Sequence, residues 1–246
     1  MPLHVYIKEN TSQKRKAISY VSYITLGIGV LLLFWSFYPV LSFELYSRFI
    51  LKNEIESPVI GNNSTSLVRD AQSVLGSSDA FSSNLKDFTQ AHLWFPGKQS
   101  TDQKLTSGIQ QYFLTIPKLN ITKAKVVVGG DDLTQSLIHY VPRSMPGEFG
   151  NVSIFGHSTL PQLYNEKDYK TIFTYLPSLQ KGDSILIELG DLEYEYEVYD
   201  MFVVSPDKVS VLDQQYDASY LTLVTCVPPG TFWKRLVIKA RLLRLP

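Results

Sequence analysis

The sequence has little cysteine and little histidine, and this scarcity excludes several kinds of site. Cys226 is the only cysteine among 246 residues, so an intrachain disulfide is impossible. The four histidines, at positions 4, 92, 139 and 157, are too scattered for a local metal motif such as a zinc finger. Phosphate-binding motifs of the GxxxxGK(S/T) and GxGxxG types are also absent. We therefore expect no metal and no cofactor.

The sequence also lacks an excess of charge of either sign. It contains 23 basic and 23 acidic residues, and so has no overall attraction for polyanions. We expect no nucleic-acid partner. Three acidic residues in predicted loops, Glu148, Glu166 and Asp168, are interpreted as solvated surface rather than as calcium ligands.

An uncharged, apolar segment covers residues 17–43. About 20 apolar residues suffice to cross a bilayer as a helix, so the sequence predicts a transmembrane helix that contacts membrane lipid. Basic residues 14–16 precede it, and the positive-inside rule places residues 1–16 in the cytoplasm and the remainder outside the cell. A cleaved signal peptide is disfavoured, because the segment is long and no small-x-small cleavage site follows. We expect a single-pass protein of the cell membrane.

Residues 44–104 have the composition of a spacer outside the cell. Short polar residues dominate at 61–66 and 76–84, and such stretches bury too little apolar surface to fold alone. Residues 46–50 are compatible with a continuation of the membrane helix. Residues 67–75 are compatible with a short helix.

The region from 105 to 246 has the pattern of one closed or nearly closed β domain. Short runs rich in β-branched and aromatic residues alternate with Gly, Pro and Asp, and they predict strands at 111–116, 121–128, 152–157, 184–189, 192–204, 221–226 and 235–243. One short helix or 3₁₀ segment is predicted at 168–176. Glutamate and tyrosine alternate over 193–199, which predicts tyrosines inward and glutamates outward. A tight turn is predicted at Gly190-Asp191.

Cys226 stands at the end of the apolar run 221–226, directly before Pro228-Pro229-Gly230. This pattern predicts a strand that ends on the cysteine, with the sulfur at a strand edge facing a loop. A lone cysteine is most often a packing residue. The strand-edge position and the nearby cations Lys234 and Arg235 favour a nucleophile instead, because cations lower the pKa of a thiol.

Two further residues are candidates for the same site. His157 ends the predicted strand 152–157, whereas His139 has no such position and is interpreted as structural. Arg235 opens the last predicted strand. If that strand forms a hairpin with 221–226, the guanidinium returns to the level of the sulfur, where its donors suit an oxyanion or a peptide carbonyl. The alternatives are a structural histidine and a solvated surface arginine.

Four motifs resemble those of the sortases, a family of membrane-anchored cysteine transpeptidases. Residues 222–226 (TLVTC) resemble the TLxTC signature, and 235–238 (RLVI) resemble the closing R-L-x-V strand. Residues 116–121 (IPKLNI) resemble the opening I-P-x-L-x-I strand. Residues 147–158 resemble the G-N-x-x-I-x-G-H segment. The motifs stand in the family's order between 109 and 245.

The resemblance implies a mainly β fold, a closed eight-stranded sortase-type β-barrel with short helices. It implies that Cys226 attacks a threonine carbonyl in an LPxTG-like sorting signal at the carboxyl terminus of a secreted protein, giving a thioacyl enzyme. His157 would protonate the leaving amine and deprotonate the incoming one. Arg235 would bind the substrate backbone or stabilise the oxyanion. The acceptor would be an amine, such as that of a cell-wall peptide or a pilin lysine.

Two family features are weak or missing in this sequence. No D-P-W/F lid motif is clear, although residues 78–81 (SDAF) resemble a degenerate version. The sequence ends at Pro246, after the last predicted strand, without the second membrane helix that is common in pilin-polymerising sortases, which argues mildly against that subgroup.

Two other functions stay open at this point. The same three residues would serve a thiol peptidase in which water outcompetes amines. A membrane-anchored β domain that binds a peptide or a wall polymer, with Cys226 as a packing residue, needs no chemistry at all.

Overall fold

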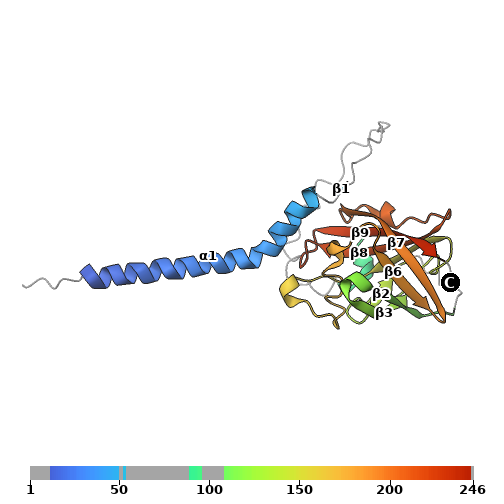
Figure 1. The fold of residues 1–246 in the computed structure, drawn as a ribbon, viewed down its shortest axis with the longest axis horizontal. Helices are drawn as coiled ribbons and strands as arrows, with labels where there is room; N and C mark the ends of the chain where they lie inside the picture. Colours follow the sequence, from blue (N-terminus) through green and yellow to red (C-terminus); the bar gives the residue numbers. More distant parts are fainter. Residues whose placement is uncertain (1–11, 50–51, 54–88, 96–107, 245–246) are drawn as a thin grey trace, which may run out of the picture. The chain divides into compact units, whose positions relative to one another are not determined.

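In the computed structural model of the protein, residues 12–49, 52–53, 89–95 and 108–244 are described. The chain divides into two compact units, residues 1–42 and residues 43–246. The segments predicted as a short helix (67–75) and as a degenerate lid motif (78–81) lie outside the described residues. Figure 1 shows the long amino-terminal helix α1 in blue and the strands from β2 to β9 in green to red.

The helix α1 (Ser12–Phe49) contains the predicted apolar segment and continues it, as expected, through residues 46–49. Its stretch Lys16–Ser47 is long and apolar enough to cross a membrane. The large apolar side chains from Ile18 to Leu41 are exposed. An exposed helix that is apolar on all sides is stable in lipid rather than in water, so α1 is a candidate membrane anchor.

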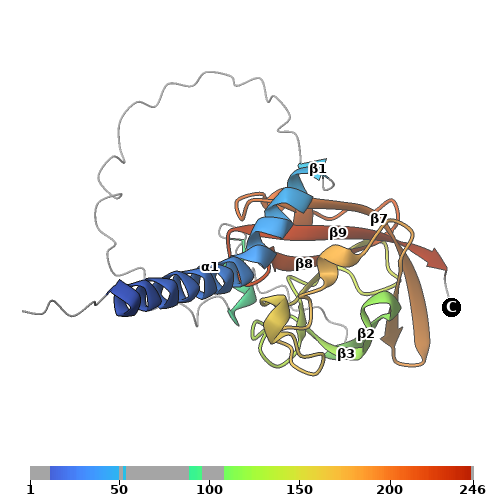
Figure 2. The same cartoon turned by 60° about the vertical axis from the view of Figure 1, so that its left-hand side comes forward.

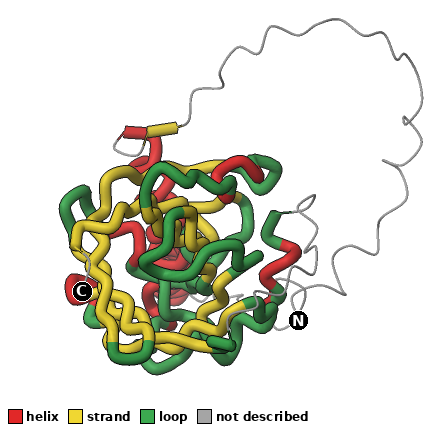
Figure 3. The backbone as a smooth tube through the Cα atoms, turned by 90° about the vertical axis from the view of Figure 1, so that its right-hand side faces the viewer, coloured by secondary structure: helices red, strands yellow, loops and turns green. Residues whose placement is uncertain are grey.

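Eight strands of the second unit form a closed barrel, as predicted. They follow one another in space as β7-β6-β2-β3-β4-β5-β8-β9, and pairing of β9 with β7 closes the ring. The tube in Figure 3 shows these strands in yellow. Two neighbouring pairs of strands, β3–β4 and β5–β8, are parallel, and the other pairs of the ring are antiparallel. The strands are β2 (Gln111–Ile116), β3 (Ile121–Val128), β4 (Leu137–His139), β5 (Gly150–Phe155), β6 (Ser184–Leu189), β7 (Leu192–Val204), β8 (Ser219–Val227) and β9 (Lys234–Arg244).

Short elements complete the described structure. The two-residue strand β1 (Lys52–Asn53) runs parallel to β7. The 3₁₀ helices are η2 (Ala91–Leu93), η3 (Pro117–Leu119), η4 (Pro161–Leu163), η5 (Leu176–Ser178) and η6 (Val209–Leu212). The short helix predicted at 168–176 is instead a series of turns that leads into η5.

The observed strands match the predicted ones closely, and the differences have local causes. β2, β3, β6 and β7 have the predicted bounds. β5 ends at Phe155, so His157 lies beyond the strand rather than at its end. β8 continues past Cys226 to Val227, so the expectation that the strand ends on the cysteine was wrong. β4 was not predicted, because three residues that are all buried show no alternation.

The hairpin of β6 and β7 confirms the predicted turn and its side-chain alternation. Leu189 pairs with Leu192 across the two-residue turn, and Gly190 has a φ of 63°, which this tight turn requires. Tyr194 and Tyr196 are buried, and the intervening glutamates are more exposed. Tyr199 is 42% exposed, so the prediction of an inward side chain was wrong there: it follows the buried Val198 and therefore shares the outward face of the glutamates. The alternation breaks only after Tyr199, because a register shift lies between Val198 and Asp200.

The barrel wall separates two hydrophobic clusters. Inward residues such as Ile154 of β5 and Leu223 of β8 belong to the interior cluster. Outward residues of the same strands, Phe155 and Val224, belong to a second cluster outside the wall. Residues of η6 and of the segment 89–95 cover that second cluster. Since successive side chains of a strand point to opposite faces, Cys226 lies on the outer face with Val224.

Candidate active site

The hairpin of β8 and β9 brings two candidate residues together. Cys226 and Arg235 are directly opposed partners across the two strands, which lie side by side in Figure 2. The Pro-Pro-Gly turn between the strands is closed by a hydrogen bond from Thr231 N to Pro228 O at 2.9 Å. The predicted return of the guanidinium to the level of the sulfur is therefore confirmed.

The parallel strand β5 carries His157 to the same end of the wall. Phe155 is the register partner of Val224, so His157, two residues beyond, is level with Cys226. Hydrogen bonds fix this end: Thr225 Oγ1 donates to Gly156 O at 2.8 Å, and Ser158 Oγ donates to Cys226 O at 2.6 Å. Thr225 thus has a positioning role.

Gly156 allows β5 and the neighbouring elements to approach closely. A Cβ atom at this position would lie 2.5 Å from side-chain atoms of both Leu137 and Phe173. Only glycine fits without displacement of its neighbours. The close approach fixes the position of His157, the next residue in the chain, along the barrel wall.

Arg235 is held in a fixed orientation although it is buried. Its side chain is 2% exposed. Nε donates to Trp94 O at 3.2 Å, and Nη1 donates to Phe232 O at 3.0 Å. Nη1 also lies 3.2 Å from Lys234 O. The alternative of a solvated surface arginine is wrong, because the guanidinium is packed and bound to carbonyl oxygens beside the cysteine.

Trp94 lies at the candidate site and was missed by the sequence interpretation. Its indole ring is stacked on Phe155 with centroids 5.4 Å apart. The ring centroid lies 5.6 Å from that of His157 and 5.5 Å from Cζ of Arg235. One aromatic side chain therefore lies against two of the three candidate residues.

The segment 89–95, which we call the cover, is bound to the loop before β4. Ala91 N donates to Asp131 O, and Leu133 N donates to Thr89 O, both at 2.9 Å. Ala91, Trp94 and Phe95 are fully buried. These residues belong to the predicted spacer 44–104, so at the cover the chain is packed rather than a flexible linker. The run of large apolar residues at 93–95 was the available signal.

Burial sets the protonation state of the site. The Cys226 thiol is 2% exposed, and burial raises its pKa to about 11, against an opposing effect of the Arg235 charge. Burial lowers the pKa of His157 to about 4, and Asp132 opposes this shift. Both groups are therefore neutral near pH 7 in the covered state. The buried Nε2 atom of His157 has no hydrogen-bond partner among the described residues.

The other histidine that was weighed, His139, lies on the opposite side of the wall. It is fully buried and packs edge-on against Tyr112 of the interior cluster, with ring centroids 5.9 Å apart. Burial lowers its pKa to about 3. The interpretation of His139 as a structural residue agrees with this position.

Two of the three acidic loop residues accept hydrogen bonds from backbone N–H groups close to them in the sequence. Glu148 Oε2 accepts from Met145 N at 2.7 Å, and Asp168 Oδ1 accepts from Lys170 N at 2.9 Å. Within the described part of the chain, no group of three His, Cys, Asp or Glu side chains could hold a metal ion.

Comparison with known proteins agrees with this geometry. Residues 114–243 match the model of the sortase domain, which covers more than half of the chain. The chain belongs to the sortase family. Members of this family are cysteine transpeptidases, and its fold is the closed barrel described above.

Individual sortases show how far the similarity extends. Sortase D of Bacillus subtilis is 31% identical over 153 residues, which are 57% of this chain and 71% of that protein. Sortase A of Bacillus anthracis is 34% identical over 89 residues, 36% of this chain and 39% of that protein. Among solved structures, a Clostridium perfringens sortase D5 transpeptidase is 29% identical, with 57% of this chain and 83% of that chain covered and a TM-score of 0.48.

Proposed function

We propose that this sortase cleaves an LPxTG-like sorting signal of secreted proteins and transfers the acyl part to an amine at the cell surface. The observation that carries the proposal is the pairing of Cys226 with Arg235 across β8 and β9, with His157 level with them on β5. A nucleophile, a proton carrier and a fixed cation at one end of one wall are the groups that acyl transfer requires.

The first half-reaction forms a thioester. The Cys226 thiolate attacks the threonine carbonyl, and the guanidinium of Arg235 stabilises the oxyanion of the tetrahedral intermediate. His157, as imidazolium, donates its proton to the leaving amine as the C–N bond breaks. The second half-reaction reverses these roles: neutral His157 takes a proton from the incoming amine, which attacks the thioester and releases the thiolate.

The cover must move before a peptide can bind. Arg235 Nε now donates to the carbonyl of Trp94, a bond that a substrate carbonyl would need. Removal of the cover also restores solvent to Cys226 and His157, so that the pKa of the thiol falls and that of the imidazole rises. Both changes favour the thiolate–imidazolium pair. We infer that the covered structure is a resting state.

The order of segments along the chain suits an enzyme that acts at a membrane surface. We propose that residues 1–16 are cytoplasmic, 17–43 span the membrane once, 44–104 link the helix to the barrel, and 105–246 form the catalytic domain outside the cell. A tethered enzyme meets secreted substrates and surface acceptors in the same layer. The acceptor would be the amine of a cell-wall peptide or a pilin lysine.

A second candidate function has one observation in its favour. Cys226 is 2% exposed and neutral, as it would be in a β domain that binds a peptide or wall polymer without chemistry. The two functions differ in what removal of the cover does to the thiol. A binding domain gains no reactive thiolate, whereas a transpeptidase does.

The test is a product assay on the full chain in detergent micelles. The enzyme is incubated with a library of LPxTG-like peptides, with and without an added amine such as triglycine. We expect cleavage that Cys226→Ala abolishes and a ligated product that appears only with the amine. Cleavage that yields only free acid under both conditions would indicate a thiol peptidase. Equal cleavage by the Cys226→Ala variant would refute the nucleophile.

A further inference from the structure

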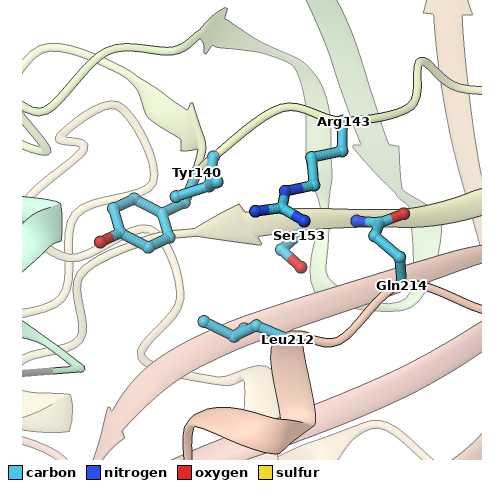
Figure 4. Close-up of a pocket in the computed structure, with 6 residues that line it drawn as sticks. Tyr140, Arg143, Ser153, Leu212 and Gln214 are labelled. Atoms are coloured by element: carbon cyan, nitrogen blue, oxygen red, sulfur yellow. The ribbon is translucent and has the colours of Figure 1, made fainter. Parts of the chain in front are cut away.

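A hollow lies on the outer face of the barrel wall, away from the three candidate residues. Figure 4 shows its lining, in which the Arg143 side chain extends from its loop across the hollow above Ser153. The hollow is lined by Tyr140, Val141, Arg143, Ser153, Leu212 and Gln214. Nothing in the acyl-transfer chemistry above uses these residues.

The hollow lies on the same face of the wall as Cys226, at a defined distance along it. Ser153 is the register partner of Thr222, which precedes Cys226 by four residues on the outward-facing set of β8. At about 3.3 Å per residue, this separation is about 13 Å, or four residues of an extended peptide. Because β8 ends one residue after Cys226, the wall extends from the cysteine in this direction only.

A row of stacked aromatic side chains leads from the candidate site to the hollow. Trp94 stacks on Phe155 at 5.4 Å, and Phe155 stacks on Tyr140 at 4.7 Å between ring centroids. Tyr140 N donates to Ser153 O at 2.8 Å at the edge of the hollow. When the cover leaves, the rings of Phe155 and Tyr140 become the floor of a track from Cys226 to the hollow.

The polar groups of the hollow suit a carboxylate. Arg143 is exposed, and its guanidinium forms no ion pair or hydrogen bond with the described residues. The Ser153 side chain likewise forms no hydrogen bond with them, although the residue is only 4% exposed. The guanidinium and the hydroxyl both line the hollow, and an acidic side chain can accept hydrogen bonds from both.

The backbone beside the hollow is strained at one residue. Val141 has a φ of 44°, which is rare for a β-branched residue and is further disfavoured before a proline. Gln214 joins the η6 loop to β5, because its Oε1 accepts from Asn151 N at 2.8 Å and its Nε2 donates to Asn151 O at 2.9 Å. Strain that the surrounding structure enforces is common at binding sites.

We propose that Arg143 and Ser153 form a specificity subsite for an acidic residue of the substrate. The subsite rests on the proposed function and adds a preference to it. The acyl half of the peptide remains attached to Cys226 between the two half-reactions, so its binding along the wall serves both. Four residues before the attacked threonine is the residue that immediately precedes the leucine of an LPxTG-like signal. The subsite selects Asp or Glu at that position.

The test compares peptides that differ only at this position. Full-length enzyme in detergent is given LPxTG-like peptides with Glu, Gln, Ala or Lys before the leucine, and kcat/KM is measured. We expect about a fivefold advantage of Glu over Ala, as for a partly exposed charge-assisted contact, and an inverted Glu-to-Lys preference in Arg143→Glu. Lys181→Glu, the same charge reversal on a distant turn, serves as the control and should keep the wild-type preference.

The outcomes separate the subsite from the reaction. Equal kcat/KM for all four peptides, or the same preference in both variants, would overturn the subsite and leave the transpeptidase intact. If no peptide of the set is cleaved, the proposed function fails and the subsite fails with it. A preference that inverts in Arg143→Glu alone supports both.

Discussion

Replacing Trp94 with alanine removes the side chain that contacts both His157 and Arg235, and the consequence for the thiol can be worked out. Burial raises the pKa of Cys226 to about 11. At pH 7.5 this leaves about 3 thiolates in 10⁴ molecules, against about 3 in 100 for a thiol with the ordinary pKa of 9.0. Opening the site should therefore increase the thiolate fraction about 100-fold.

The labelling rate of Cys226 should increase less than the fraction of thiolate does. The intrinsic nucleophilicity of a thiolate falls with its pKa, with a Brønsted coefficient of about 0.45, so each thiolate becomes about eightfold less reactive over this range. The net expectation is a rise of about tenfold in the second-order rate of iodoacetamide labelling at pH 7.5. Easier access of the reagent adds to this value. The apparent pKa read from the pH dependence of labelling should fall toward 9.

The assay uses the full chain in detergent, with labelling followed by intact mass. Trp233→Ala is the matched control, because Trp233 is 65% exposed and the substitution removes the same kind of side chain from a solvent-exposed position. Its labelling rate should equal that of the wild type. Thermal unfolding monitored by circular dichroism checks that the barrel stays folded in both variants. An unchanged rate and an unchanged apparent pKa in Trp94→Ala would show that the cover does not control the thiol.

Three further predictions concern other residues of the wall. Arg235→Lys should lower kcat/KM at least 100-fold despite the retained charge, because lysine cannot reproduce the Nε and Nη1 hydrogen bonds; a near-normal value would show that the charge alone suffices. Gly156→Ala should destabilise the protein by about 2 kcal/mol, since the added Cβ would lie 2.5 Å from Leu137 and Phe173, and an unaltered melting temperature would contradict the close approach. His139 has its pKa lowered from 6.5 to about 3, so the stability gained from its neutral form is present above pH 6.5 and is lost as the pH falls toward 3. His139→Leu should therefore flatten the fall in melting temperature between pH 7 and pH 4, and an equally steep fall would assign the acid sensitivity to other groups.

Much of the fold follows from short-range patterns in the sequence. The alternation of Glu and Tyr in β7 and the Gly-Asp turn before it depend on neighbouring residues, and the structure confirms both. The hairpin that pairs Cys226 with Arg235 is also local, because a short turn leaves the two strands little choice of register. Patterns of this kind can be recognised without knowledge of the tertiary structure.

The features that could not be predicted depend on contacts between distant segments. β4 is too short to show a period, and it exists because β3 and β5 pair with it on either side. Trp94 is separated from Arg235 by 141 residues and lies in a polar region that resembles a linker. Its burial arises only when the cover packs on the outer wall.

The most direct measurement of the central assignment is the detection of a thioacyl enzyme on Cys226. Full-length protein is mixed with an LPxTG-like peptide without an amine acceptor, quenched in acid, and analysed by intact and peptide-level mass spectrometry. We predict an adduct equal to the acyl half of the peptide, located on Cys226, released by hydroxylamine and depleted in Arg235→Lys. Peptide cleavage without an adduct on Cys226, together with equal cleavage by Cys226→Ala, would contradict the assignment.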